Sequence, residues 1–240
     1  MPPRTEIETV ELAGLTTRIV GNGPITCVLL HGFGAPGDDL VALAQYIPLP
    51  AATGGAAGVR FVFPAAPIEL GGLYGDSRAW WHLDLARLEQ DLRTGAIRDR
   101  RGEIPTGLAE VRTQIDALLS ALKDRYAVDD SKLVLGGFSQ GAMLALDVAL
   151  HRATAPAAVI LMSGTLIAES EWRPLYAKLA NTPILQSHGR ADSLLPFMIA
   201  ELLRDDLTAA GAKVEFIPFN GGHEIPPPVL LQAGKLLAQL

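Results

Sequence analysis

The stretch that decides the fold is Leu133-Val134-Leu135-Gly136-Gly137-Phe138-Ser139-Gln140-Gly141-Ala142. Its first half is an apolar, strand-like run, and Ala142 begins a segment with helical spacing. A strand that turns directly into a helix at a serine needs tight backbone angles, and the flanking glycines permit them. We therefore expect the Ser139 hydroxyl to stand exposed at the end of the strand, where a nucleophile would lie.

The same alternation of strand and helix extends over most of the chain. Apolar or β-branched runs predict strands at 7–12, 16–20, 25–30, 59–63, 133–138, 158–162, 184–186 and 214–219, the first two forming a hairpin. Helical spacing marks 40–47, 108–122, 142–150, 172–179, 199–207 and 229–237. This order predicts an α/β fold with a mostly parallel, eight-stranded sheet that helices cover on both faces.

Residues 71–101 do not follow this alternation. They contain the adjacent Trp80 and Trp81, a short apolar stripe at 85, 88 and 92, and a run of mixed charge at 98–101. We interpret the segment as a long excursion between the fourth and fifth strands that covers a site, since such excursions are often functional. A solvated surface helix is the alternative.

Length and composition restrict the remaining possibilities. A chain of 240 residues with 49% hydrophobic and 19% charged residues suits a single domain over 1–240. The net charge of -6 argues against nucleic-acid binding, and the single cysteine excludes an intrachain disulfide. The sequence has no signal-peptide pattern and no apolar run near the ~18 residues of a membrane span. We expect a cytoplasmic protein without stable membrane association, and a monomer or homodimer.

A serine hydroxyl needs a general base. When the serine lies on a strand–helix turn, the acid follows it in the chain and a histidine base follows the acid. His151 lies ten or so residues along the helix behind Ser139, about 15 Å away, which is too far. His188 precedes the best acid candidate. His223 follows the last strand in a glycine-rich loop and is therefore the predicted base. The five histidines show no paired ligand spacing, so we expect no metal and no cofactor.

The predicted acid is Asp192, which lies in the loop after the seventh strand. A carboxylate there would hold His223 in the tautomer that accepts the Ser139 proton. A loop aspartate that only caps the next helix is the structural alternative. Glu224 also adjoins His223, but neighbouring residues rarely fold back to share one hydrogen bond to Nδ1.

Backbone N–H groups near Ser139 would stabilise a developing oxyanion. One candidate is the amide of Gln140 at the start of its helix, where the helix dipole also favours negative charge. The second is the amide of Phe33 in His31-Gly32-Phe33-Gly34, with those of Gly32 and Gly34 as alternatives. We interpret His31 as a structural turn residue, because it precedes the nucleophile in the chain.

Several apolar side chains fall in or beside loops at the carboxyl ends of the predicted strands, where ligands bind in open α/β sheets. The predicted substrate-binding residues are Trp80, Trp81, Leu73, Leu166 and Leu194. Ordinary core packing is the alternative for Leu166. Since consecutive residues seldom both point into a core, we expect at least one of the two tryptophans to face substrate.

At these motifs the sequence resembles the phospholipase/carboxylesterase family of α/β-hydrolases, which includes bacterial carboxylesterases and acyl-protein thioesterases. The matching stretches are 30–34, 63–67, 80–81, 136–141, 162–164, 188–192 and 222–226. The resemblance implies the α/β-hydrolase fold, a Ser139–His223–Asp192 triad, and oxyanion donors at Phe33 and Gln140. His82 departs from the family pattern, which usually has Asp there, and 83–101 departs from the thioesterase members.

The expected function is that of a serine carboxylesterase acting on a small-molecule substrate, a short- to medium-chain acyl ester. An acyl-protein or acyl-CoA thioesterase, or a lysophospholipase, would use the same triad and is the alternative. A non-catalytic binding protein of this fold is disfavoured, because such a protein would be expected to have lost a member of the triad.

Overall fold

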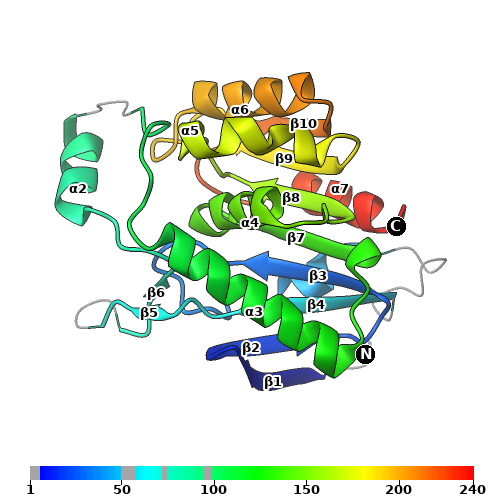
Figure 1. The fold of residues 1–240 in the computed structure, drawn as a ribbon. Coiled ribbons are helices and arrows are strands. Elements are labelled where there is room, and N and C mark those ends of the chain that lie inside the picture. Colours follow the sequence, from blue (N-terminus) through cyan, green and yellow to red (C-terminus); the bar gives the residue numbers. More distant parts are fainter. Residues whose placement is uncertain (1–5, 50–57, 72–74, 95–98) are drawn as a thin grey trace.

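The computed structural model describes residues 6–49, 58–71, 75–94 and 99–240, without the side chains of 85, 88, 89, 91 and 92 in α2. Its centre is an eight-stranded sheet (Figure 1). In spatial order the strands are β1 (Ile7–Leu12), β2 (Leu15–Val20), β4 (Val59–Pro64), β3 (Ile25–Leu30), β7 (Leu133–Phe138), β8 (Ala158–Met162), β9 (Pro183–Gly189) and β10 (Lys213–Phe219). The pairs β1–β2 and β2–β4 are antiparallel, and every pair from β4–β3 to β9–β10 is parallel.

Helices cover both faces of this sheet. The described helices are α1 (Leu43–Tyr46), α2 (Leu85–Thr94), α3 (Leu108–Tyr126), α4 (Gln140–His151), α5 (Glu169–Trp172), α6 (Phe197–Ala209) and α7 (Pro227–Leu237). One apolar core joins the sheet to α3, α4 and α6, and a second joins the other face to α1 and α7. In Figure 1, α3 and α4 lie in front of the sheet, α7 lies behind it, and α2 stands at its left edge.

The alternation of side chains along β3 explains the two cores. Val28 and Leu30 pack into the core with α3 and α4, whereas Cys27 and Leu29 pack into the core with α7. All six residues of this strand are buried, as expected for a central parallel strand. Burial raises the pKa of the Cys27 thiol to about 12, so this cysteine is an inert core residue. The predicted mostly parallel sheet with helices on both faces is confirmed.

Two predicted helices are shorter than expected. Instead of a helix over 40–47, only Leu43–Tyr46 is α-helical, and the Asp38 carboxylate faces Arg18 at 3.5 Å. The predicted helix at 172–179 is the end of α5 followed by a 3₁₀ helix at Arg173–Leu179. Pro174 has no amide hydrogen to donate to the preceding turn, so the α-helix cannot continue through it.

The described part of the excursion at 71–101 contains the helix α2, which was the alternative interpretation, and a short strand. Arg78–Ala79 forms a short strand, β6, that pairs antiparallel with β5 (Ile68–Glu69). Strands of two residues show no periodicity, so no sequence pattern predicts this second sheet. Among the helices that the structure describes, none is both long and apolar enough to cross a membrane.

Candidate active site

Ser139 occupies a sharp turn between β7 and α4. Its backbone angles, φ 54° and ψ -119°, are unusual for a residue with a side chain, and its amide donates to the carbonyl of Met162 at 2.9 Å. The turn brings two backbones together: a Cβ at Gly137 would lie 2.5 Å from the carbonyl oxygen of Leu30. Only glycine fits there, so the glycine before the serine is required by the close approach of β3.

The structure brings the three predicted reactive side chains together. Nε2 of His223 lies 2.8 Å from Oγ of Ser139, and Nδ1 of His223 lies 2.7 Å from Oδ2 of Asp192. The three residues follow β7, β9 and β10, whose carboxyl ends lie at one edge of the sheet. The Asp192 side chain is fully buried, whereas that of His223 is 14% exposed.

The surroundings of Asp192 keep its carboxylate ionised. Burial alone would raise its pKa, but the hydrogen bond and charge of His223 and the amide of Leu195 hold the pKa below its ordinary value. Oδ1 accepts the amides of Leu194 and Leu195, both at 2.9 Å. Because an ionised carboxylate only accepts, Nδ1 of His223 carries the hydrogen, and Nε2 accepts the hydroxyl of Ser139.

Two further contacts hold the histidine loop. The ring of Phe138 packs against the imidazole of His223 with 4.8 Å between ring centres. The hydroxyl of Ser163, at the end of β8, donates to the carbonyl of Glu224 at 3.1 Å. Sequence reasoning assigned Ser163 no role, although its place in the Met162-Ser163-Gly164 stretch was a signal.

His188 lies beside the site but has a different position from His223. Its side chain is fully buried, with Nε2 2.9 Å from the carbonyl of Leu195 and 3.3 Å from Oδ2 of Asp192. Burial lowers the pKa of His188 and keeps it neutral. A neutral imidazole here donates to the Leu195 carbonyl and supports the loop that carries Asp192.

The loop after β3 places a backbone amide near Ser139. Within the described residues, the amides of Phe33 and Gln140 donate no hydrogen bond, and both residues line the same cavity as Ser139. The amide of Gly34, by contrast, donates to the carbonyl of Arg78 at 2.8 Å and is already engaged. Gln140 is the first residue of α4, where the helix dipole adds to the favourable field.

His31 supports the backbone of this loop. Its Nε2 accepts the amide of Ala66 at 2.9 Å, so Nδ1 carries the hydrogen and donates to the carbonyl of Gly32 at 2.8 Å. Burial lowers the pKa of His31 to about 4. The imidazole is therefore a neutral structural group, in agreement with its interpretation as a turn residue.

The side chain of Gln140 joins the serine turn to the tryptophan pair. Its Oε1 accepts the amide of Trp80 and its Nε2 donates to the carbonyl of Trp81, both at 2.9 Å. The indole of Trp80 in turn donates to the carbonyl of His31 at 2.8 Å. Both tryptophans are buried, although consecutive residues seldom both point into a core. The expectation that at least one of them faces substrate stays a prediction.

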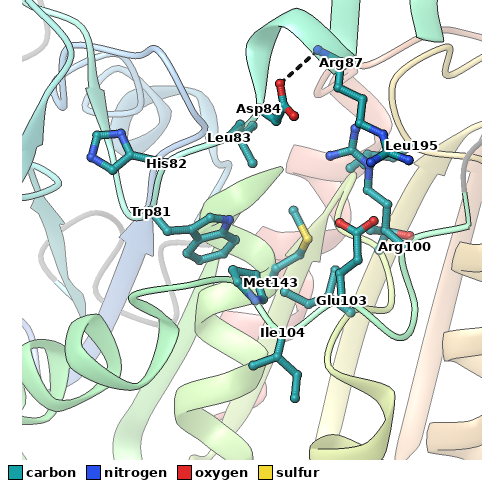
Figure 2. A pocket seen from close by; sticks show the side chains of 13 residues that line it. Trp81, His82, Leu83, Asp84, Arg87, Arg100, Glu103, Ile104, Met143 and Leu195 are labelled. Carbon is teal, nitrogen blue, oxygen red and sulfur yellow. Dashed lines mark hydrogen bonds between the residues drawn. The ribbon is translucent and has the colours of Figure 1, made fainter.

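Two cavities meet beside Ser139. The reaction cavity has a volume of about 170 Å³ and is lined by Ser139, His223, Phe33, Gln140, Phe138 and Leu194, among others. The side cavity, shown in Figure 2, has a volume of about 320 Å³. The two share Leu83, Arg100, Met143 and Leu195, so they lie side by side.

The predicted substrate-binding residues divide between these cavities and the core. Leu194 lines the reaction cavity, and Trp81 lines the side cavity. Trp80 and Leu166 are fully buried and line neither cavity, because they pack in the core between the sheet and its helices. Leu73 lies outside the described residues. Sequence reasoning missed Met143, Leu195 and Arg100, which no motif marks.

The fold and these side chains define a class of protein. A mostly parallel sheet with a serine on a strand–helix turn, then an aspartate and a histidine at the ends of later strands, is the arrangement of α/β-hydrolases. No cluster of three metal-ligating side chains occurs among the residues described.

The family follows from comparison with known proteins. A model of the phospholipase/carboxylesterase family matches residues 24–240, and the chain belongs to that family. It is 30% identical over 214 residues to acyl-protein thioesterase 1 of Mycosarcoma maydis (80% of each chain), and 26% identical over 211 residues to acyl-protein thioesterase 1 homolog 1 of Dictyostelium discoideum (84% of each). The crystal structure of esterase PE8 superposes with a TM-score of 0.76 at 27% identity, covering 94% of this chain and 98% of that one. The protein is a serine hydrolase of the carboxylesterase and thioesterase class.

Proposed function

We propose that this protein hydrolyses short- to medium-chain acyl esters with Ser139 as nucleophile, His223 as general base and Asp192 as the acid that orients it. The observation that carries the proposal is the single imidazole of His223 within hydrogen-bond distance of both other side chains, at 2.8 and 2.7 Å. Those distances meet the geometric requirement for proton transfer between a nucleophile and its base.

The proposed reaction has two halves. Oγ of Ser139 attacks the ester carbonyl carbon while its proton passes to Nε2 of His223. The negative charge that develops on the carbonyl oxygen is stabilised by the amides of Phe33 and Gln140. The C–O bond to the alcohol breaks, and His223 gives its proton to the leaving alkoxide. The product of this half is an acyl-enzyme. Water then attacks the acyl carbon, and its proton passes through His223 to Oγ as the acid departs.

The ionised Asp192 has two effects in this scheme. It holds Nδ1–H of His223, so that Nε2 faces Ser139 without a proton. It also stabilises the imidazolium that forms when His223 accepts the proton of the hydroxyl. The two backbone amides that bind the other side of Asp192 keep the carboxylate fixed in that orientation.

Replacement of Ser139 by alanine tests the proposal directly. We expect hydrolysis of p-nitrophenyl butyrate to fall by at least three orders of magnitude, with an unchanged circular dichroism spectrum. A fluorophosphonate probe should label Ser139 of the native enzyme and no other residue, as mapped by mass spectrometry. Substantial activity of Ser139→Ala, or labelling at another serine, would exclude Ser139 as the nucleophile.

Hydrolysis of thioesters is the second candidate, because two of the relatives are named acyl-protein thioesterases. The same three side chains would serve, with a thiolate in place of an alkoxide as leaving group. Acyl-CoA and p-nitrophenyl esters of equal acyl length, assayed in parallel, would distinguish the two activities. A lysophospholipid, assayed in parallel with these substrates, would test the lysophospholipase alternative. The single domain, the cytoplasmic location and the monomeric or homodimeric state stay predictions.

A further inference from the structure

The side cavity beside Ser139 has an apolar part and a charged part. Trp81, Met143 and Ile104 provide apolar surface, and two arginines come from separate segments, Arg87 from α2 and Arg100 from the chain after it. Figure 2 shows the guanidinium groups of Arg87 and Arg100 on the same side of the cavity, away from His82. A molecule that extends from Ser139 into this cavity would therefore meet both apolar surface and positive charge.

Among the residues that the structure describes, neither of these arginines has an acidic partner. Across the described residues, Arg87 and Arg100 form no ion pair, whereas the neighbouring Arg101 pairs with Asp99 at 2.5 Å and lies 4.0 Å from Glu169. The cavity wall does contain two carboxylates, but Asp84 already accepts the amide of Arg87 at 3.0 Å, and Glu103 is engaged in an interaction of its own.

Arg100 is the more informative of the two. It is only partly exposed and lines both the side cavity and the reaction cavity. A partly buried arginine loses part of its hydration, and among the described residues no carboxylate pairs with Arg100 to compensate for that loss. A carboxylate on a bound molecule would compensate, because the planar guanidinium binds it with two parallel hydrogen bonds.

We propose that the side cavity binds the anionic end of the substrate, an ester with a carboxylate several bonds from the scissile carbonyl. Arg100 is the residue that determines this specificity, and Arg87 adds a second positive charge. The chain between ester and carboxylate lies along Trp81 and Met143. The inference rests on the proposed function, because it places the carboxylate relative to a carbonyl at Ser139.

Two esters of equal length test the inference. Monoethyl adipate carries a carboxylate where ethyl hexanoate carries a methyl group, and hydrolysis of both is followed by chromatography of the released acid. In the wild-type enzyme we expect a higher kcat/KM for monoethyl adipate. Arg100→Gln should lower the ratio of the two kcat/KM values roughly ten- to hundredfold, the usual effect of removing one charged hydrogen-bond partner. Arg100→Lys, which keeps the charge but loses the fork, should give an intermediate ratio.

Arg101→Gln is the matched control. Arg101 is the next residue in the chain and carries the same charge, but it does not line the cavity. The ratio of this variant should equal that of the wild type. A third substrate, 6-acetoxyhexanoate, places the carboxylate on the alcohol side of the ester. Whichever charged ester responds to Arg100→Gln shows which part of the substrate enters the side cavity.

Two results would overturn the inference, and they differ in what they say of the proposed function. If ethyl hexanoate is hydrolysed but Arg100→Gln leaves the kcat/KM of both charged esters, each relative to that of ethyl hexanoate, at the wild-type value, the anionic specificity is wrong and the esterase proposal stands. If the wild-type enzyme hydrolyses none of the three esters, both proposals fail.

Discussion

The indole nitrogen of Trp80 donates a hydrogen bond of 2.8 Å to the carbonyl oxygen of His31. That carbonyl lies directly before Gly32 and Phe33, in the loop that supplies a proposed oxyanion donor. On its other side, Trp80 is held by the side chain of Gln140, next to Ser139. The serine turn and the oxyanion loop are therefore connected through a tryptophan that lines neither cavity. We interpret Trp80 as a positioning residue.

Trp80→Phe should lower kcat about ten- to hundredfold and leave KM almost unchanged. The variant keeps an aromatic ring in the core but removes the N–H group that fixes the oxyanion loop, and poor donor placement weakens binding of the transition state more than of the ester. The measurement is kcat and KM for p-nitrophenyl butyrate and p-nitrophenyl hexanoate. The ratio of the two kcat/KM values should not change, because the residue does not contact the acyl chain.

Trp172→Phe is the control for this prediction. It removes another buried indole N–H, which donates to Asp147 at 2.8 Å away from the cavities. We expect it to lower the free energy of unfolding but not kcat. An equal loss of kcat in both variants would mean that the effect of Trp80→Phe is general destabilisation.

Asp192→Asn should lower kcat by roughly three to four orders of magnitude. The amide that replaces the carboxylate offers an N–H group to His223 and favours the tautomer with hydrogen on Nε2, which cannot accept the proton of Ser139. Steady-state rates with p-nitrophenyl butyrate measure the loss. Asp205→Asn, at an exposed carboxylate paired with Arg204, should keep full activity. A decrease of less than tenfold in Asp192→Asn would contradict the orienting role.

The sequence predicts those parts of the structure that arise from local patterns. The central strands of the main sheet were found because their buried runs, such as 25–30, are continuous and apolar. Ser139, Asp192 and His223 were selected as the candidate triad because their order along the chain and their places after strands are typical of the fold.

The sequence does not predict contacts between distant segments. The hydrogen bonds of Gln140 to Trp80 and Trp81 join positions about 60 residues apart, and no periodicity records them. For the same reason Trp80 was assigned to the substrate pocket, although it lines neither cavity. Arg100 was missed because a charge in a polar run is normally solvated.

Gly141→Ala should destabilise the protein by about 1–3 kcal/mol or more, because a Cβ there would collide with the backbone carbonyl of Leu30 in β3. Neither backbone can move without disturbing the turn at Ser139. Gly102→Ala is the control, since a Cβ at that position meets open space. Urea denaturation of both variants measures the difference, and an equal midpoint for the two would show that β3 and α4 are not in tight contact.

The stability of the protein should decrease as the pH falls from about 6.5 to about 4. Burial lowers the pKa of His31 from 6.5 to about 4, so in this range the unfolded chain binds a proton that the native protein does not. Such a shift of the pKa corresponds to on the order of 3 kcal/mol of the free energy of unfolding, at about 1.36 kcal/mol for each pH unit. Burial lowers the pKa of His188 as well, which acts in the same direction. The free energy of unfolding in urea at pH 7.5 and 4.5 measures this loss.

The contribution of His31 can be separated from that of the other groups. In ¹³C-labelled protein, the Cε1 signal of His31 should keep its neutral chemical shift down to a pH near 4, and this reading needs no substitution. His31→Gln should be less stable at pH 7.5, because the hydrogen bonds to Gly32 and Ala66 change, but it should lose less stability on acidification. A His31 signal that titrates near pH 6.5 would contradict the buried neutral state. The loop that carries the proposed oxyanion donor would then be held by a charged imidazole, which the amide of Ala66, a donor, could not contact.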